Sequence, residues 1–118
     1  MFGRRPIESI DARVASDRFF TAEIVLVDVR SRAEYEQVRI PGTVHIPVHE
    51  VGRRLEEVRT DRPVAFVCRS GHRSMAAARK AAKHREDVLN VAGGMNAWLA
   101  AGLPAARCRV SPDRKGSR

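Results

Sequence analysis

One short stretch holds the side chains best suited to covalent chemistry. An apolar run at residues 64–67 ends in Cys68, a polar loop follows, and an alanine-rich segment begins near Ser74. We interpret this order as a buried strand, a tight loop and the start of a helix. A cysteine at such a junction faces the unpaired N–H groups of the helix, which stabilise a thiolate and lower the pKa of the thiol. The stretch therefore predicts a nucleophilic cysteine in an anion-binding loop.

Positive charge in the same loop supports this interpretation. Arg69, Arg73 and, when protonated, His72 place charge where it further favours the thiolate. The alternative is a structural cysteine that ends a core strand, because buried free cysteines are common, but the polar neighbours of Cys68 argue against it. We therefore take Cys68 as the candidate catalytic residue, and the substrate-binding candidates are Arg69, Ser70, Gly71, His72, Arg73 and Ser74.

Hydrophobic periodicity predicts the elements that must position this loop. Apolar or alternating runs predict strands at residues 7–10, 24–27, 43–46, 64–67 and 87–91, and helices at residues 12–20, 31–38, 48–58, 74–83 and 95–101. Strands that alternate with helices predict an α/β fold, with a mostly parallel central sheet of about five strands and helices on both faces. Ligands bind such sheets at the carboxyl ends of the strands, where both Asp28 and Cys68 fall.

Local patterns make these expectations specific. Asp11 is suited to cap the first helix, and Ser31 with Glu34 forms the capping-box pattern of the second. The pair Gly93-Gly94 predicts a structural turn, because a nucleotide-binding fingerprint needs a different context. The side chains that we expect to turn inward from helices are Val14, Phe19, Phe20, Val51, Leu55, Val58 and Trp98.

The composition fits one small folded domain. A chain of 118 residues, 43% of them apolar, is long enough for a hydrophobic core without disulfides. The net charge of +8 is compatible with a nucleic acid, an acidic protein partner or anionic substrates, whereas an aromatic content of 5% argues against a base-stacking nucleic-acid surface. About half of the surplus charge falls at the carboxyl end. We therefore assign residues 1–106 to the domain and residues 107–118 to a basic, disordered tail.

Other features predict a reduced setting without a metal. The first residues lack the apolar core of a signal peptide, and no apolar run is long enough to span a membrane, so we expect a cytoplasmic protein with free thiols and no membrane contact. The histidines and the two cysteines lack metal-ligand spacing. Cys108 is either a bystander or a resolving thiol that reacts with Cys68, and its place on the tail favours the bystander.

Together these motifs resemble a single-domain rhodanese, of the thiosulfate sulfurtransferase-like family. The resemblance covers the chain from about residue 7 to residue 104 and departs from the family at Val38-Arg39, where a Gly-His pair is usual. The order and spacing of several motifs carry it: Val27-Asp28-Val29-Arg30, Glu34-Tyr35, Ile40-Pro41-Gly42 with Ile46-Pro47, the Cys68 loop, and Gly93-Gly94 with Trp98 and Gly102-Leu103-Pro104.

The resemblance implies that Cys68 is the nucleophile of a sulfurtransferase that needs no cofactor. It would take sulfur from thiosulfate or a persulfide donor and hold it as a persulfide, which a thiophilic acceptor such as cyanide, a thiol or a protein cysteine would then remove. We expect a monomer or weak dimer. Asp28 either accepts hydrogen bonds from the loop or caps a helix, and Arg30 either binds an anion or pairs with an acid such as Glu34. Arg73 either contacts the substrate or pairs with a carboxylate.

Two other functions stay open at this point. Phosphatases and arsenate reductases with a related cysteine loop have one more residue in it, so that their arginine falls where this chain has Ser74. The shorter loop makes that chemistry the weaker alternative. The other alternative is a non-catalytic module whose basic face binds an acidic protein or an RNA, and the intact Cys68 loop weighs against it.

Overall fold

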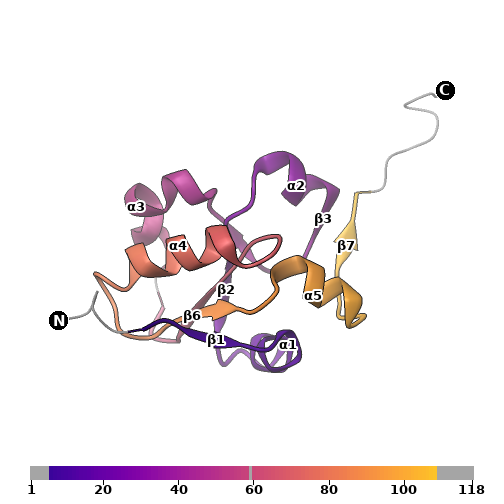
Figure 1. Ribbon diagram of the computed structural model, residues 1–118, viewed down its shortest axis with the longest axis horizontal. Helices are drawn as coiled ribbons and strands as arrows, with labels where there is room; N and C mark the ends of the chain where they lie inside the picture. Colours follow the sequence, from indigo (N-terminus) through magenta and orange to yellow (C-terminus); the bar gives the residue numbers. More distant parts are fainter. Residues whose placement is uncertain (1–5, 59, 109–118) are drawn as a thin grey trace.

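A computed structural model describes residues 6–58 and 60–108 and confirms the expected α/β architecture. Two 3₁₀ turns, at Val48–Glu50 and Leu55–Glu57, flank α3. The helices and strands in chain order are β1 (Glu8–Ile10), α1 (Ala12–Phe20), β2 (Val25–Asp28), α2 (Arg32–Gln37), β3 (Val38–Arg39), β4 (Val44–His45), α3 (Val51–Arg54), β5 (Val64–Val67), α4 (His72–Ala81), β6 (Val88–Val91), α5 (Gly94–Ala100) and β7 (Ala106–Arg107). Five parallel strands form the main sheet in the order β1-β6-β5-β2-β4, and β3 pairs with β7 in a separate antiparallel ribbon (Figure 1).

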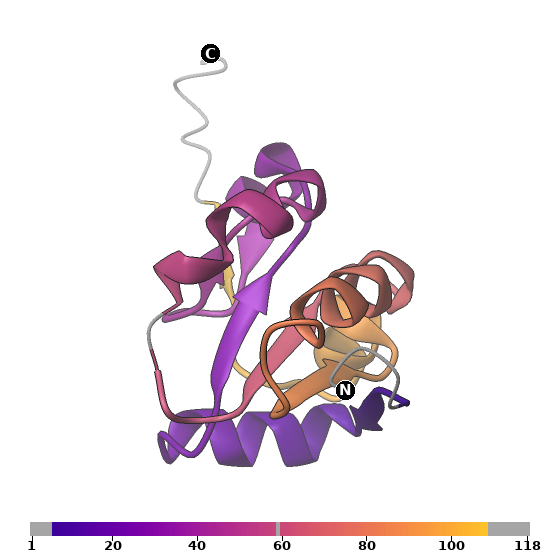
Figure 2. The ribbon, with the colours of Figure 1, turned by 90° about the vertical axis from the view of Figure 1, so that its left-hand side faces the viewer.

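Helices cover both faces of the sheet, and successive strand residues alternate between the two faces. Leu26 and Val67 pack in a cluster with α1 and α5, whereas Val27 and Phe66 pack in a cluster with α3 and α4. Figure 2 shows α1 running along the bottom of the sheet, with α4 on the other side. Because side chains alternate along an extended chain, Cys68, two residues after Phe66, belongs to the cluster on the α3 and α4 face.

Several sequence patterns produce the local structure that they predict. Asp11 caps α1 by accepting a hydrogen bond of 2.7 Å from a backbone N–H in the first turn. Ser31 and Glu34 form the complete capping box of α2. Trp98 is fully buried, and its indole N–H donates to the carbonyl of Pro104 at 2.8 Å, which ties the chain after α5 to the core.

The inward face of α1 differs from our expectation. Val14 and Phe20 are 39% and 49% exposed, whereas Ala12, Ala15 and Ser16 lie against the sheet. These three share one helix face at the i, i+3 and i+4 spacing. Their small side chains allow the helix to approach the sheet closely. Of the three side chains of α1 that we expected to turn inward, only Phe19 packs against this core, and it is only partly buried.

The prediction of one helix at residues 48–58 was also wrong. The structure there has the four residues of α3 between two 3₁₀ turns, because Gly52 and several β-branched valines are poor helix formers. Val38 ends α2 and begins β3 instead of lying in the helix. The helix expected from Ser74 begins two residues earlier, at His72.

The ribbon of β3 and β7 was not predicted. β7 includes Arg107, where we expected the tail to begin, and the N–H of Cys108 donates to the carbonyl of Gln37 at 2.7 Å. The rest of the expected tail lies outside the described residues. Among the residues that the structure describes, no helix combines the length and apolar character needed to cross a membrane.

Candidate active site

Cys68 directly follows β5, the middle strand of the sheet, and is only 1% exposed. The chain then turns through Gly71 and enters α4 at His72. Gly71 has a φ of +113°, a left-handed conformation that glycine adopts without strain. An added Cβ at Gly71 would meet only ordinary contacts, so the backbone conformation, and not lack of space, calls for glycine here.

Hydrogen-bond donors surround the sulfur of Cys68. The N–H of Gly71 donates to Sγ at 3.0 Å, and the hydroxyl of Ser74 donates at 3.3 Å. Burial raises the pKa of the Cys68 thiol, but the Ser74 hydroxyl and the backbone N–H groups of Ser74, Gly71 and Ser70 together bring that pKa below its ordinary value. The loop therefore favours the thiolate, which is the nucleophilic form.

The first turn of α5 supports the loop from behind. The N–H of Met95 donates to the carbonyl of Cys68 at 2.7 Å, and the N–H of Asn96 donates to the carbonyl of Arg69 at 3.0 Å. A Cβ added to Gly94 would lie 2.4 Å from the Cys68 carbonyl oxygen, so only glycine permits this approach. With these carbonyls held by α5, the loop directs its N–H groups toward the sulfur. The glycine pair that predicted only a turn thus also supports the active-site loop.

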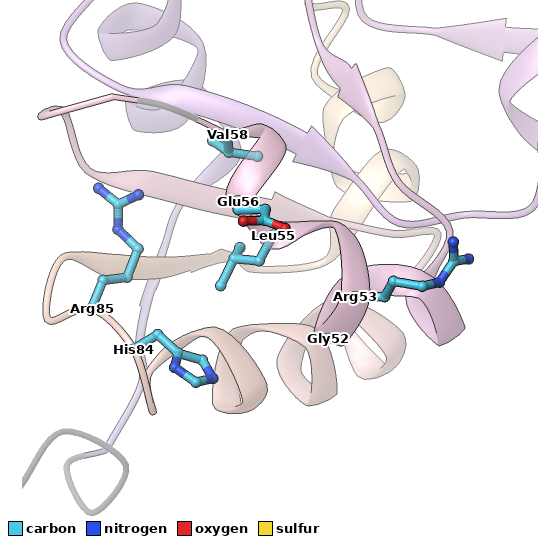
Figure 3. Close-up of a pocket in the computed structure, with 7 residues that line it drawn as sticks. All are labelled: Gly52, Arg53, Leu55, Glu56, Val58, His84 and Arg85. Atoms are coloured by element: carbon cyan, nitrogen blue, oxygen red, sulfur yellow. The ribbon is translucent and has the colours of Figure 1, made fainter.

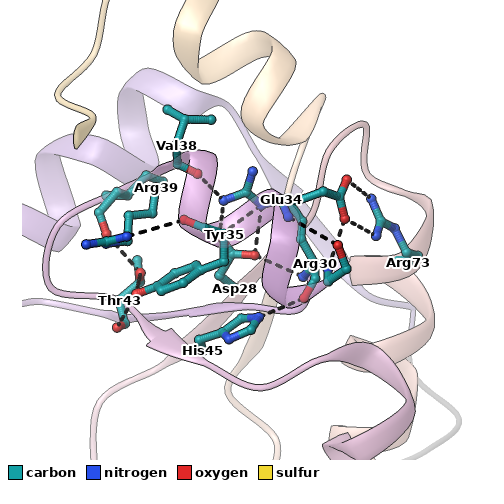
Figure 4. A network of polar contacts seen from close by, with 11 residues as sticks. Asp28, Arg30, Glu34, Tyr35, Val38, Arg39, Thr43, His45 and Arg73 are labelled. Carbon is teal, nitrogen blue, oxygen red and sulfur yellow. Dashed lines mark hydrogen bonds and ion pairs between the residues drawn. The ribbon is translucent and has the colours of Figure 1, made fainter. Parts of the chain in front are cut away.

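Of the two roles open for Arg73, the structure shows the pair with a carboxylate (Figure 4). Its guanidinium donates to both oxygens of Glu34 at 2.7 and 2.9 Å. The hydrogen bonds from Arg73, together with those from Ser31, lower the pKa of Glu34 to about 2, although burial acts in the opposite direction. Glu34 also accepts the N–H of Ser31 at 2.9 Å, so one carboxylate joins the start of α2 to the first turn of α4. Glu34 and, to a smaller extent, the Cys68 thiolate raise the pKa of Arg73, so its charge in turn favours the thiolate.

Asp28 and Arg30 form a buried ion pair at the carboxyl end of β2. Asp28 is fully buried, Arg30 is 3% exposed, and the guanidinium donates to both carboxylate oxygens at 2.8–3.1 Å. Arg30 also donates to the carbonyl of Val38 at 2.6 Å. Arg30 does pair with an acid, as one of our two expectations had it, but that acid is Asp28 and not Glu34. In the described part of the chain, the carboxylate of Asp28 accepts only from the guanidinium and the backbone N–H of Arg30, so Asp28 neither caps a helix nor accepts a hydrogen bond from the Cys68 loop.

A small cavity of about 240 Å³ lies beside the loop, between Arg69 and the Glu34 that Arg73 holds. Arg30 reaches its wall, and α5, β3 and the end of α2 supply the rest of the lining, with Met95, Asn96, Leu99, Val38 and Gln37. No local pattern marked the α5 residues as part of the site, because they reach it only through the packing of α5 behind the loop. On the other side, Ser70 and His72 are exposed and lie 3.3 Å apart (Oγ to Nδ1).

Asn90, on β6, lies beneath the loop and is another residue that the sequence did not single out. It is buried, and its Nδ2 donates to the hydroxyl of Ser9 at 3.2 Å. A Cβ built on Gly71 would lie 4.0 Å from this nitrogen. Its Oδ1 is the one buried side-chain nitrogen or oxygen without a hydrogen-bond partner in the described ranges. Nor do three or more potential metal-ligating side chains gather anywhere in those ranges.

Comparison with known proteins agrees with this geometry. The model of the rhodanese-like domain family matches residues 11–101. The chain belongs to the rhodanese-like family. A sulfurtransferase of Allochromatium vinosum is 39% identical to this rhodanese-like domain over 83% of the chain and 94% of the relative. A putative sulfur carrier protein of Bacillus subtilis is 39% identical over 78% of the chain, which spans only 48% of that protein.

A solved structure shows the same fold. The crystal structure of a rhodanese-related protein from Thermoplasma volcanium superimposes with a TM-score of 0.78, at 25% identity, over 84% of this chain and 97% of that chain. The rhodanese-like assignment therefore rests on the sequence relatives and on the three-dimensional arrangement alike.

Proposed function

We propose that this rhodanese-like domain is a sulfurtransferase that carries sulfane sulfur on Cys68 as a persulfide. The observation that carries the proposal is the set of donors around Sγ, the N–H of Gly71 and the hydroxyl of Ser74. These donors stabilise the attacking thiolate and suit the persulfide anion that forms from it. The sulfurtransferase named among the relatives supports this class of reaction.

In the first half-reaction, the Cys68 thiolate attacks the outer sulfur of thiosulfate or of a persulfide donor. The sulfur–sulfur bond of the donor breaks, and sulfite, or the donor's thiolate, leaves with the bonding electrons. Arg69, at the wall of the cavity beside the loop, offers positive charge to an anionic donor. Arg30 reaches the same cavity, although Asp28 already balances its charge.

In the second half-reaction, a thiophilic acceptor, either a thiolate or cyanide, attacks the outer sulfur of the persulfide. The bond between the two sulfurs breaks, and Cys68 leaves as a thiolate. Because the loop lowers the pKa of Cys68, it also makes Cys68 a better leaving group. The acceptor is a small thiol, cyanide or a protein cysteine, and we place the exchange in a reduced compartment such as the cytoplasm, where both thiols stay free.

The phosphatase alternative has less support. Phosphate binding in such loops needs an arginine directed at the substrate, whereas here both guanidinium ends of Arg73 bind Glu34. Ser74, at the place of that arginine, donates its hydroxyl to the sulfur instead. Both observations favour a sulfur atom over a phosphate in the loop.

The decisive experiment is an intact-mass spectrum after incubation with thiosulfate. The wild-type chain and Cys108→Ser should each gain one sulfur atom, which cyanide or a reducing thiol removes, and Cys68→Ser should gain none. If Cys68→Ser gained sulfur and Cys108→Ser did not, Cys108 would be the sulfur carrier, and the role proposed for Cys68 would be wrong. No gain with thiosulfate or with a small organic persulfide would rule out the sulfurtransferase function.

A further inference from the structure

A groove lies at the carboxyl end of α4, at the opposite end of that helix from the Cys68 loop. Two adjoining hollows of about 410 and 230 Å³ share Gly52, Leu55 and His84 and lie between α3, its following 3₁₀ turn and the end of α4. Figure 3 shows the residues that line the larger hollow. α4 has 10 residues, so its two ends are about 15 Å apart at 1.5 Å per residue. A ligand in this groove would leave the Cys68 loop clear.

Positive charge surrounds the groove. One lining residue, Glu56, carries a carboxylate, whereas the lining cations are Arg53, Lys80, Lys83 and Arg85. Glu50 lies 3.5 Å from Arg53, and Asp87 binds Arg85 at 2.6 Å, so both arginines are paired. Lys80 and Lys83, by contrast, are exposed and form no ion pair with any described residue. A cation in the last turn of a helix complements the helix dipole, which accounts for Lys80. It does not account for Lys83, which lies beyond the helix.

The floor of the groove is apolar. Leu55 is partly exposed in both hollows, and Val51 and Val58 are buried beneath it. An inorganic anion or a nucleic-acid backbone would use the cations but gain nothing from this floor. No Phe, Tyr or Trp lines either hollow, so the surface on which bases could stack is limited to His84 and the guanidinium planes of Arg53 and Arg85. A second copy of this chain would bring its own charge of +8 against the same cations.

An acidic peptide with an apolar side chain matches both properties. We propose that this groove binds an acidic, leucine-containing segment of a partner protein, with the apolar side chain on Leu55 and the carboxylates near Lys80 and Lys83. The proposal gives a role to the basic surface around this groove, which the sulfur chemistry does not use. It does not depend on the reaction at Cys68, since the two places lie at opposite ends of α4.

Gly52 allows a direct test, because a Cβ added there would meet no atom within 4 Å. Gly52→Trp would therefore fill the groove without a clash at its first atom. We would measure the fluorescence anisotropy of a labelled peptide in which glutamates flank two leucines, with the full chain and its variants. The peptide should bind, and Gly52→Trp should weaken the binding about tenfold or more.

The double variant Lys80→Glu/Lys83→Glu should weaken binding at least about fivefold, since it turns two attractive surface pairs into repulsive ones. The matched control is Arg13→Glu/Arg18→Glu, which makes the same change of charge on exposed residues of α1, on the other face of the sheet. This control should keep the affinity within about twofold. Circular dichroism melts of all variants show that each is folded.

Four results would overturn the proposal. The peptide could fail to bind, or it could bind all variants equally, which would make the attraction one of net charge alone. A peptide with alanines in place of the leucines could bind as tightly, which would remove the role of Leu55. Finally, a single-stranded RNA could bind more tightly than the peptide and lose affinity in the same variants, which would make the groove a nucleic-acid site.

Discussion

The hydroxyl of Ser74 offers the sharpest test of how the loop activates Cys68. It lies 3.3 Å from Sγ, and Ser74 is fully buried, so bulk water does not compete for this contact. Ser74→Ala removes this donor but keeps the backbone N–H in the first turn of α4. The change therefore separates the side-chain contribution to the pKa of Cys68 from the contribution of the backbone.

A hydrogen bond to a charged group contributes about 1.5–3 kcal/mol, and one pKa unit corresponds to about 1.4 kcal/mol. Because the contact of Ser74 with the sulfur is long, we take the lower end and expect the pKa of Cys68 to rise by about one unit. Below that pKa the fraction of thiolate then falls about tenfold. A more basic thiolate is also more nucleophilic, so the rate of attack should fall only about threefold to tenfold.

The measurement is the ultraviolet absorbance of the thiolate against pH, in a Cys108→Ser background that leaves one titrating thiol. Ser70→Ala is the matched control, because the Ser70 hydroxyl faces Nδ1 of His72 at 3.3 Å while its backbone N–H is retained. That variant should keep the pKa of the parent. If Ser74→Ala, shown to be folded, titrates like Ser70→Ala, the hydroxyl does not stabilise the thiolate and the backbone N–H groups act alone.

Three further predictions concern residues that hold the loop. Since the pKa of Glu34 drops from 4.5 to about 2 on folding, its ion pair should stabilise the protein fully above about pH 4.5 and progressively less as the pH falls toward 2. Solvent screening limits this contribution to the free energy of unfolding to about 1–2 kcal/mol. Urea unfolding at several pH values should show that Glu34→Gln lacks this pH dependence. Gly94→Ala should lower the free energy of unfolding by at least about 2 kcal/mol, because it combines a left-handed conformation with a Cβ 2.4 Å from the Cys68 carbonyl oxygen; wild-type stability would mean that α5 does not support the loop. Asn90→Leu should change that free energy by less than about 1 kcal/mol, because the lost bond to Ser9 is offset by removal of the unpaired carbonyl; a loss above about 3 kcal/mol would reveal a hidden partner of Oδ1.

The strands and the cysteine loop could be predicted because their signals are local. The apolar run of β5 is buried along its whole length, and the polar residues after Cys68 mark where the strand ends. The capping box of α2 is likewise a pattern of neighbours, since Ser31 and Glu34 bond to each other. Such signals do not depend on where the rest of the chain lies.

The face of α1 and the break at residues 48–58 could not be predicted in this way. Periodicity predicts that a helix has an apolar side. The distance between the helix and the sheet, which the sequence pattern does not give, determines whether a phenylalanine or an alanine fits between them. In α1 Ala15 is fully buried, whereas Phe20 stays about half exposed. Likewise, the spacing of Val51, Leu55 and Val58 is helical, although the backbone between them tightens into a 3₁₀ turn.

The role of Arg73 shows most clearly where sequence reasoning about the site ends. Arg73 is the sixth residue of the segment that starts at Cys68. Its guanidinium could bind either a substrate anion or a carboxylate, and the neighbouring residues in the sequence do not distinguish the two. The choice comes from α2, whose capping box places Glu34 so that it meets both ends of the guanidinium. The sulfur is then left to uncharged donors, the N–H of Gly71 and the hydroxyl of Ser74. With Arg73 bound to Glu34, these donors favour the Cys68 thiolate, and this arrangement is the reason why we propose sulfur transfer and not phosphate chemistry.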